Sequence, residues 1–243
     1  MNGLEYRFLY PAHEGHRWLW TSPPRFVSVV EETPPVIVSP LITSPTRPKR
    51  IVAIDLDETC IKSYEGRGRP QTMPADNATR VYELDLGDAV VWGMRRPFLN
   101  DFLRAAQNQF DYVVIYTASE TPYAKAATEM IFEGLNKPHR IYARSECQTD
   151  GKGWYKPLQR VCDDFGVGVE NLLMIDNNHF VIEPRFRVNL VHVPDYLPNP
   201  MREEKDVCLA ELSQWLGELP AECDFRALDK SKIFSTEPIM YRM

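Results

Sequence analysis

The chain has 243 residues, of which 44% are hydrophobic and 26% charged, and its formal net charge is -6. This length allows one large domain with extensions, and the composition is that of an ordinary globular protein. The negative net charge disfavours nucleic acid as a partner, because a phosphate backbone attracts clustered basic residues. The five cysteines form no CxxC pair and have no zinc-finger spacing, so we expect free thiols in a reducing compartment.

The sequence also gives no sign of a membrane partner. It has no run of 18 or more apolar residues, and its N-terminus lacks a basic region followed by an apolar one. We therefore expect an intracellular soluble protein, either nuclear or cytoplasmic.

The chain is predicted to consist of a proline-rich N-terminal extension over 1–49, a main domain over 50–220 and a C-terminal extension over 221–243. Frequent prolines disfavour helices and central strands in the first segment. That segment also contains Trp18, Trp20 and Phe26, more apolar surface than a disordered tail usually carries, so part of it is expected to pack along the main domain. Its role is left open by the sequence.

Strands and helices are predicted to alternate from residue 51 onward. Short β-branched runs predict strands, whereas apolar residues at helical spacing, such as Leu99, Phe102, Leu103 and Ala106 together with Phe98, predict helices. Because parallel strands need a crossover between them, this alternation predicts an α/β fold. We expect a Rossmann-like open parallel sheet with helices on both faces. The predicted strands are 51–55, 111–119, 140–143, 171–176 and 185–193, and the predicted helices are 96–110, 121–135, 155–166 and 202–219.

A small β-hairpin insertion is predicted after the first strand, within residues 60–92. Residues 81–86 and 89–92 have the pattern of two strands, and Gly87-Asp88 between them is a favourable hairpin turn. The insertion would overhang the strand ends where ligands bind in such sheets, so we expect it to form a small cap or a substrate wall.

Polar residues with phosphoryl-transfer chemistry follow several of these strands. Asp55 and Asp57 follow the first strand, Thr117 and Ala118 the second, and Asp176 and Asn177 the strand over 171–176, while Lys156 lies near a helix start. In an open α/β sheet these positions share one edge.

Each of these residues has a chemical role in a phosphate site. The carboxylate of Asp55 could attack phosphorus, and Asp57 could protonate the leaving oxygen and then deprotonate water. Mg²⁺ could be bound by Asp55, the main-chain carbonyl of Asp57 and one oxygen from Asp176 or Asn177. The Thr117 hydroxyl, the Ala118 N–H and the Lys156 ammonium would contact the phosphate.

The order of the motifs DLDET, RP with FLNDFL, VVIYTAS, WYKPL and LLMIDNN resembles the haloacid dehalogenase (HAD) superfamily of phosphatases. Within it, the chain is similar to the FCP/SCP-like branch that dephosphorylates the carboxy-terminal domain (CTD) of RNA polymerase II. The resemblance runs from about Ile51 to Leu216 and implies a HAD-like phosphatase domain. Where the branch commonly has DNSP, this chain has Asp-Asn-Asn-His at 176–179, which leaves the metal position intact.

The resemblance also implies roles and a function. Asp55 would be nucleophile and metal ligand, Asp57 acid/base and carbonyl ligand, Asn177 the direct metal ligand, and Asp176 a supporting neighbour. The expected activity is a Mg²⁺-dependent protein serine/threonine phosphatase with an aspartyl-phosphate intermediate, and the expected partner is a phosphoprotein. Alternatives are a phosphatase for a polynucleotide 3′-phosphate or a small metabolite, and a non-catalytic binding module. Arg96 is a candidate substrate contact, since arginine forks bind phosphate well.

Overall fold

The computed structural model describes residues 47–64, 68–149, 151 and 153–234. The chain divides into two units, 1–44 and 45–243, and all described residues belong to the second. Most of the predicted N-terminal extension, and the last nine residues of the predicted C-terminal extension, lie outside the described residues. The predicted extensions and their boundaries therefore stay predictions.

A five-stranded parallel sheet forms the centre of this unit, with the strand order β10-β9-β1-β5-β6. β1 lies in the middle and pairs along its whole length with β5 on one side and β9 on the other. The predicted open parallel sheet is confirmed. Its strands are β1 (Ile51–Ile54), β5 (Tyr112–Tyr116), β6 (Arg140–Tyr142), β9 (Leu172–Asp176) and β10 (Leu190–His192).

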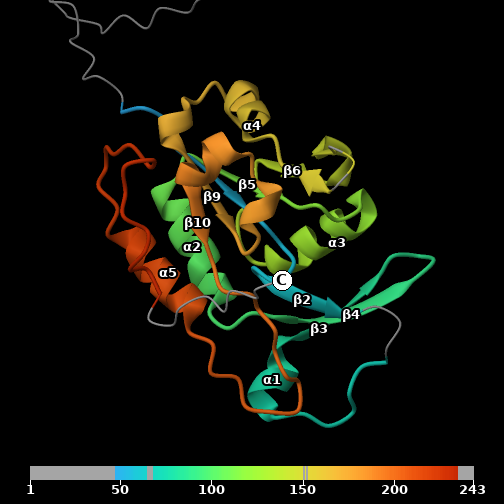
Figure 1. Ribbon diagram of the computed structural model, residues 1–243. Coiled ribbons are helices and arrows are strands. Elements are labelled where there is room, and N and C mark those ends of the chain that lie inside the picture. Colours follow the sequence, from blue (N-terminus) through green and yellow to red (C-terminus); the bar gives the residue numbers. More distant parts are fainter. Residues whose placement is uncertain (1–46, 65–67, 150, 152, 235–243) are drawn as a thin grey trace, which may run out of the picture. The chain divides into compact units, whose positions relative to one another are not determined.

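Helices cover both faces of this sheet, as predicted. Side chains alternate along a strand, so Val52 and Ile54 of β1 pack in the cluster that holds the apolar residues of α2, α3 and α5. Ile51 and Ala53 face the opposite way, into the cluster of α4. Figure 1 shows α2 and α5 next to each other. The helices are α2 (Leu99–Gln109), α3 (Thr121–Ile131), α4 (Leu158–Phe165) and α5 (Cys208–Gly217).

The insertion after β1 is a separate antiparallel sheet with the strand order β2-β4-β3. The predicted hairpin is confirmed as β3 and β4, and Gly87 in its turn has a φ of 90°, which glycine adopts without steric cost. A third strand and a short helix were not predicted, and β4 continues past Trp92 to Arg95. These elements are β2 (Ile61–Tyr64), α1 (Ala75–Arg80), β3 (Val81–Asp85) and β4 (Val90–Arg95).

Several local predictions are wrong. The helix predicted over 202–219 begins only at Cys208. Residues 184–189 form the 3-10 helix η4 (Pro184–Asn189) rather than the first part of a strand, and Asn189 is buried there, donating to the carbonyls of Val169 and Leu172. Phe98 does not join the buried face of α2. It precedes the helix with a φ of 62° and is 47% exposed.

Short elements complete the described unit. A two-stranded antiparallel sheet lies in the connection that leads to α4. The remaining elements are η1 (Arg144–Glu146), β7 (Gln148–Thr149), β8 (Trp154–Tyr155), η2 (Val169–Asn171) and η3 (His179–Val181).

Candidate active site

Three neighbouring strands bring the predicted site residues to one edge of the sheet. Asp55 follows β1, Thr117 follows β5, and Asp176 is the last residue of β9. Because β9, β1 and β5 are adjacent and parallel, these three residues lie side by side at the carboxyl end of the sheet, where ligands bind in open α/β folds. Lys156 reaches the same edge from the segment before α4, where its main-chain N–H donates to the Val181 carbonyl at 2.7 Å.

Lys156 lies between two of the predicted acidic residues. Its ammonium donates to Asp55 Oδ1 at 2.6 Å and to Asp176 Oδ2 at 2.7 Å, and all three residues are buried. Burial by itself lowers the pKa of Lys156, but the charges of Asp176 and Asp55 outweigh it and raise the pKa above its ordinary value. Burial raises the pKa of Asp176, against the attraction of the Lys156 ammonium. Lys156 is therefore held as a fixed positive charge against Asp55.

Thr59 links Asp55 to the loop after β9, a role that we did not predict. The Thr59 hydroxyl lies 3.1 Å from Asp55 Oδ2 and 3.0 Å from Asn177 Oδ1, and it accepts the main-chain N–H of Asn177 at 3.1 Å. Thr59 is fully buried. The motif DxDxT could have indicated this contact, because the hydroxyl of its threonine, two residues past the second aspartate, lies within reach of the first aspartate.

Asp57 has a different environment from Asp55. Its Oδ2 accepts the Ser119 hydroxyl at 2.6 Å, and its Oδ1 accepts the Tyr123 hydroxyl at 2.5 Å. Burial raises the pKa of Asp57 to about 6, and the charge of Asp55 adds to this, while the two hydroxyl donors oppose it. A carboxyl group with this pKa exchanges its proton near neutral pH.

The donors to Asp57 connect it to the insertion. The Tyr123 hydroxyl also contacts the Ser63 hydroxyl of β2, which lies 2.7 Å from the Tyr82 hydroxyl of β3. Neither Ser119 nor Tyr123 was predicted to bind Asp57. Ser119 follows the predicted phosphate contacts in TAS, but Tyr123 lies on α3 and only the fold brings it to the first loop.

The loop between the two aspartates and β2 is tightly closed. The Cys60 and Ile61 N–H groups both donate to the Leu56 carbonyl, at 2.8 and 3.0 Å. Glu58 has a φ of 56°, a left-handed conformation that is strained for a residue with a Cβ atom. This turn holds the carboxyl groups of Asp55 and Asp57 on the same side while the Leu56 side chain between them is buried.

The loop after β5 carries the predicted phosphate contacts. Thr117 is buried, and its hydroxyl oxygen accepts the Ser119 N–H at 3.1 Å, so the hydroxyl proton is oriented toward another acceptor. The Ala118 carbonyl accepts Arg144 Nε at 2.7 Å, which fixes the loop from outside.

The donor set at this edge fits a hard cation such as Mg²⁺. Asp55 Oδ2 and Asn177 Oδ1 converge on the same Thr59 hydroxyl, so a carboxylate and an amide oxygen face one small volume. Oxygen ligands of this kind suit Mg²⁺, which binds few protein groups and keeps several waters. The described part of the chain contains no group of three or more His, Cys, Asp and Glu side chains arranged to bind a metal ion, so these two oxygens and the main chain of the first loop are the candidate ligands.

Arg96 does not reach the site with its side chain. It is 2% exposed, and its guanidinium pairs with Asp206 at 2.9 Å and donates to the carbonyls of Thr59 and Pro194 at 3.1 and 2.9 Å. All of these partners belong to the protein, so we withdraw Arg96 as a candidate substrate contact. Its position indicates that it supports the first loop through the Thr59 carbonyl.

A cavity of about 580 Å³ opens beside Asp57. One wall comes from the turn and strand of the insertion, including Leu86 and Val90, and the other from the loop after β5 and the start of α3, including Ser119 and Tyr123. The insertion therefore forms one wall of a cavity next to the expected acid/base, and its role as a cap or a substrate wall stays a prediction.

The family model "NLI interacting factor-like phosphatase" matches residues 50–226, which include every site residue described above. The chain belongs to this phosphatase family. The predicted family is confirmed, and this family member is a phosphoric monoester hydrolase.

Curated relatives agree with this family. The chain is 26% identical over 197 residues to a Caenorhabditis elegans protein named "CTD nuclear envelope phosphatase 1 homolog", covering 79% of this chain and 76% of the relative. It is 25% identical over 176 residues to the human "Carboxy-terminal domain RNA polymerase II polypeptide A small phosphatase 1", covering 71% of this chain and 61% of the relative.

Solved structures are more distant. A structure of Fcp1, described as an essential RNA polymerase II CTD phosphatase, matches at 20% identity with a TM-score of 0.49, covering 61% of this chain and 42% of Fcp1. Within the described residues, no helix is both long and apolar enough to cross a membrane.

Proposed function

We propose that this family member is a Mg²⁺-dependent protein serine/threonine phosphatase that works through an aspartyl-phosphate on Asp55. The observation that supports this most strongly is the contrast between its two neighbouring aspartates. Asp55 is paired with the Lys156 ammonium, whose nitrogen lies 2.6 Å from Asp55 Oδ1. Asp57 is partly buried and its pKa is raised to about 6, so it can hold a proton. Two carboxyl groups with opposite environments are suited to the roles of nucleophile and general acid.

In the first half-reaction, an Asp55 carboxylate oxygen forms a bond to phosphorus while the bond from phosphorus to the serine or threonine oxygen breaks. The leaving oxygen takes the proton from Asp57. Thr117 and the Ala118 N–H donate to the phosphoryl oxygens, and Lys156 provides positive charge beside the nucleophile.

In the second half-reaction, the now ionised Asp57 takes a proton from water as the water oxygen bonds to phosphorus. The bond from phosphorus to Asp55 breaks, inorganic phosphate leaves, and both carboxyl groups return to their starting states. A Mg²⁺ ion bound by Asp55, Asn177 and the Asp57 carbonyl would supply positive charge that offsets the phosphoryl oxygens.

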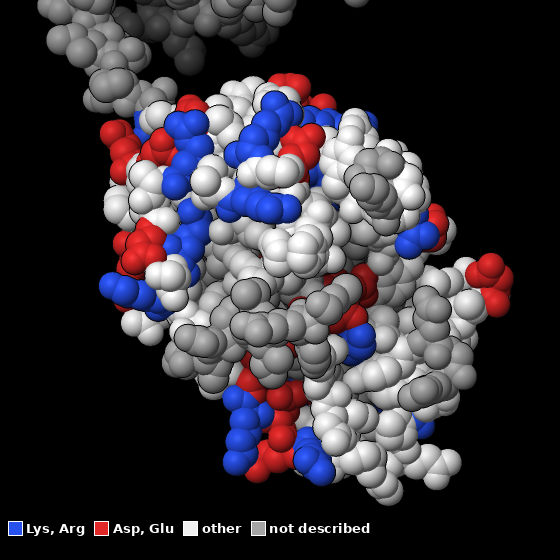
Figure 2. Space-filling view, in the orientation of Figure 1, with Lys and Arg blue, Asp and Glu red and all other residues white. Residues whose placement is uncertain are grey.

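The surroundings of the site support a phosphoprotein as substrate. The cavity beside Asp57 opens between the insertion and α3, so a side chain on an extended peptide can enter it. Figure 2 shows lysine and arginine side chains interspersed with aspartate and glutamate over the face in view. A polynucleotide phosphate would be served better by a continuous basic surface.

Asp55→Asn tests the mechanism, because an amide cannot form the acyl phosphate. The variant should lose hydrolysis of an aryl phosphate and of phosphoserine peptides, with a wild-type circular dichroism spectrum at the assay temperature as the folding control. Retained aryl phosphate hydrolysis would exclude the covalent mechanism. Removal of divalent cations with a chelator should abolish turnover, and added Mg²⁺ should restore it.

Substrate class needs parallel assays on phosphopeptides, a 3′-phosphorylated oligonucleotide and sugar phosphates. We expect phosphopeptides to have the highest kcat/KM. A higher kcat/KM on the oligonucleotide or a sugar phosphate would show that our proposed substrate class is wrong. The proposed reaction mechanism would be unaffected. Binding of phosphopeptides with no turnover in the presence of Mg²⁺ would indicate a binding module.

A further inference from the structure

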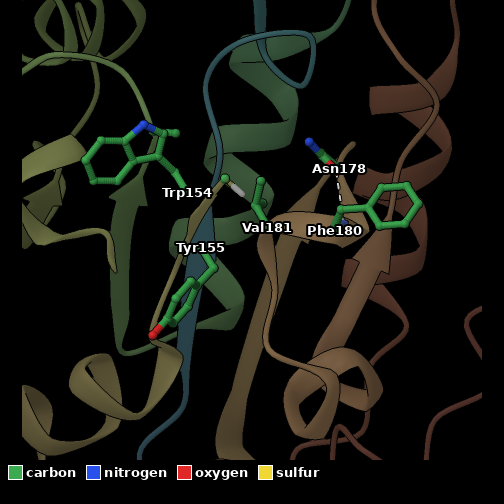
Figure 3. A pocket seen from close by; sticks show the side chains of 7 residues that line it. Trp154, Tyr155, Asn178, Phe180 and Val181 are labelled. Atoms are coloured by element: carbon green, nitrogen blue, oxygen red, sulfur yellow. Dashed lines mark hydrogen bonds between the residues drawn. The ribbon is translucent and has the colours of Figure 1, made fainter. Parts of the chain in front are cut away.

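A second cavity, of about 450 Å³, lies on the other side of the Thr117 loop. Trp154 and Phe180 form opposite sides of it, with Val181 between them and Tyr155 below (Figure 3). The seven described residues that line it include no charged side chain. Phe180 is 72% exposed and Trp154 44% exposed, an unusual amount of aromatic surface in contact with water.

This cavity is lined by chain neighbours of the candidate catalytic residues. Three of its lining residues are direct chain neighbours of catalytic positions: Ala118 follows Thr117, Tyr155 precedes Lys156, and Asn178 follows Asn177. Ser119, the residue after Ala118, lines the cavity beside Asp57 instead. The loop after β5 therefore contributes neighbouring residues to both cavities.

The walls of this cavity are tied together by main-chain hydrogen bonds. The Lys156 N–H donates to the Val181 carbonyl at 2.7 Å, and the Asn178 side chain accepts the Phe180 N–H at 3.0 Å, as drawn in Figure 3. Trp154 pairs with Thr149 in the β7-β8 sheet. A cavity with walls fixed in this way pays little ordering cost when a ligand enters.

The two cavities differ in chemistry. The cavity beside Asp57 combines the charged residues Glu58, Glu120 and Arg144 with the apolar residues of the insertion, whereas the described lining of the second cavity is aromatic, aliphatic and amide. A peptide that contacts both cavities would meet charged and apolar side chains in the first and no charged side chain among the described residues of the second.

We propose that the second cavity binds a large apolar side chain, leucine or an aromatic residue, which lies within three residues of the phosphorylated serine or threonine of the substrate. This inference rests on the proposed protein phosphatase function and adds a specificity determinant to it. Burial of the apolar side chain against Trp154 and Phe180 removes apolar area from water on both partners. The volume of about 450 Å³ is within the range of pockets that hold small ligands, ~300–1,000 Å³.

The test uses the full chain and a set of phosphoserine peptides in a glycine and serine background. Each peptide carries one phenylalanine, placed at one of the three positions before or after the phosphoserine. For the wild-type chain we expect phenylalanine on one side of the phosphoserine to raise kcat/KM about tenfold over the background peptide. This factor corresponds to about 1.4 kcal/mol. The gain should be mainly a lower KM, because this side chain is distant from the bonds that change.

Phe180→Ala and Trp154→Ala should each remove most of this preference, and Phe180→Leu should retain part of it. Phe98→Ala is the matched control, because Phe98 is another exposed phenylalanine, is 47% exposed and lines neither cavity. Its preference should equal that of the wild-type chain. Melting temperatures of all variants show that a lost preference is not caused by unfolding.

The results separate the inference from the proposed function. If the wild-type chain hydrolyses all peptides equally well, or if the preference survives both alanine variants, the inference is wrong and the phosphatase function stands. If the chain hydrolyses an aryl phosphate and no peptide, both are wrong. If Phe180→Ala changes the sedimentation of the protein and not its peptide preference, the cavity is an interface between copies of the chain, and the inference is also wrong.

Discussion

Lys156→Met is the substitution that tests the arrangement of the site most directly. Methionine has a similar length and fills the same space, but it leaves Asp55 and Asp176 buried with no ammonium between them. In the wild-type chain these carboxyl groups lie 2.6 and 2.7 Å from the lysine nitrogen, and the two aspartates are only 6% and 1% exposed. Removal of one partner from such a buried ionic group typically costs about 3–5 kcal/mol of unfolding free energy.

The cost should depend on pH in a defined direction. Without the ammonium, burial and mutual repulsion raise the pKa of at least one of the two carboxyl groups further above its unfolded value of about 3.9. The folded variant then binds more protons than its unfolded state. Its stability should increase as pH falls, by up to about 1.4 kcal/mol per pH unit between the raised folded pKa and about pH 4.

Urea unfolding at several pH values measures this effect, with a chelator present so that cation binding does not compensate. Lys156→Met with Asp176→Asn should recover about 1 kcal/mol or more at pH 7, because one buried charge is gone. Both variants should lose phosphatase activity by about 10²-fold or more, because the fixed positive charge is missing. Lys137→Met, at an exposed lysine, is the control for loss of one positive charge.

Equal stability of Lys156→Met and the wild-type chain across this pH range would contradict the buried ion triad. A loss of stability that the second substitution does not reduce would place its cause in packing rather than in charge. The activity measurements alone would not separate these outcomes, since both leave the site without lysine.

Three further predictions concern the surroundings of the reacting groups. Ser119→Ala removes a donor that lowers the pKa of Asp57, so the loss of activity on phosphopeptides above about pH 6, where this acid loses its proton, should shift to higher pH. An aryl phosphate with a good leaving group should show a smaller shift. Thr59→Val should cost about 1–3 kcal/mol in urea unfolding and weaken Mg²⁺ activation, because it leaves the Asn177 N–H unpaired. Gly93→Ala should lower the melting temperature, since its Cβ would lie 2.4 Å from the carbonyl of the paired strand and from a buried tyrosine ring.

The sequence predicted the part of the site that depends on strand ends. Asp55, Thr117 and Asp176 could be placed together because each ends or follows an apolar run, and the parallel sheet brings such positions to one edge. Lys156 was harder to place, since it follows a two-residue strand outside that sheet, and the sequence located it only near a helix start and by its place in the motif order.

Apart from Thr59, whose contact with Asp55 is local, the residues that the sequence did not assign act over long distances in the chain. Tyr123 and Asp57 are 66 positions apart, and their contact depends on how α3 begins after β5. Arg96 was misjudged for a related reason. Two consecutive arginines before a proline are typical of an exposed loop, and the burial of Arg96 depends on its ion pair with Asp206, 110 positions away. Local patterns do not encode such contacts.

The wrong strand at residues 185–193 has a local cause. Val188 and the alternating pattern around it are typical of a strand, but Pro184 favours a helical start, and the side chain of Asn189 satisfies main-chain carbonyls inside the protein. Val188 is 50% exposed as a result. Only residues 190–192 of the predicted strand form a strand, β10, which pairs with β9.

The hydrogen bonds around Asp57 imply that the acid and the substrate wall are not independent parts of this phosphatase. Tyr123 contacts both Asp57 and Ser63, and Ser63 belongs to a strand of the insertion and contacts Tyr82 on another. A change in the insertion that moves Ser63 therefore changes how Tyr123 donates to Asp57, and with it the pKa of the acid. Variants of the insertion should for this reason alter both the pH dependence of turnover and the choice of substrate. Variants at Phe180, which lines the second cavity, should alter only the choice of substrate.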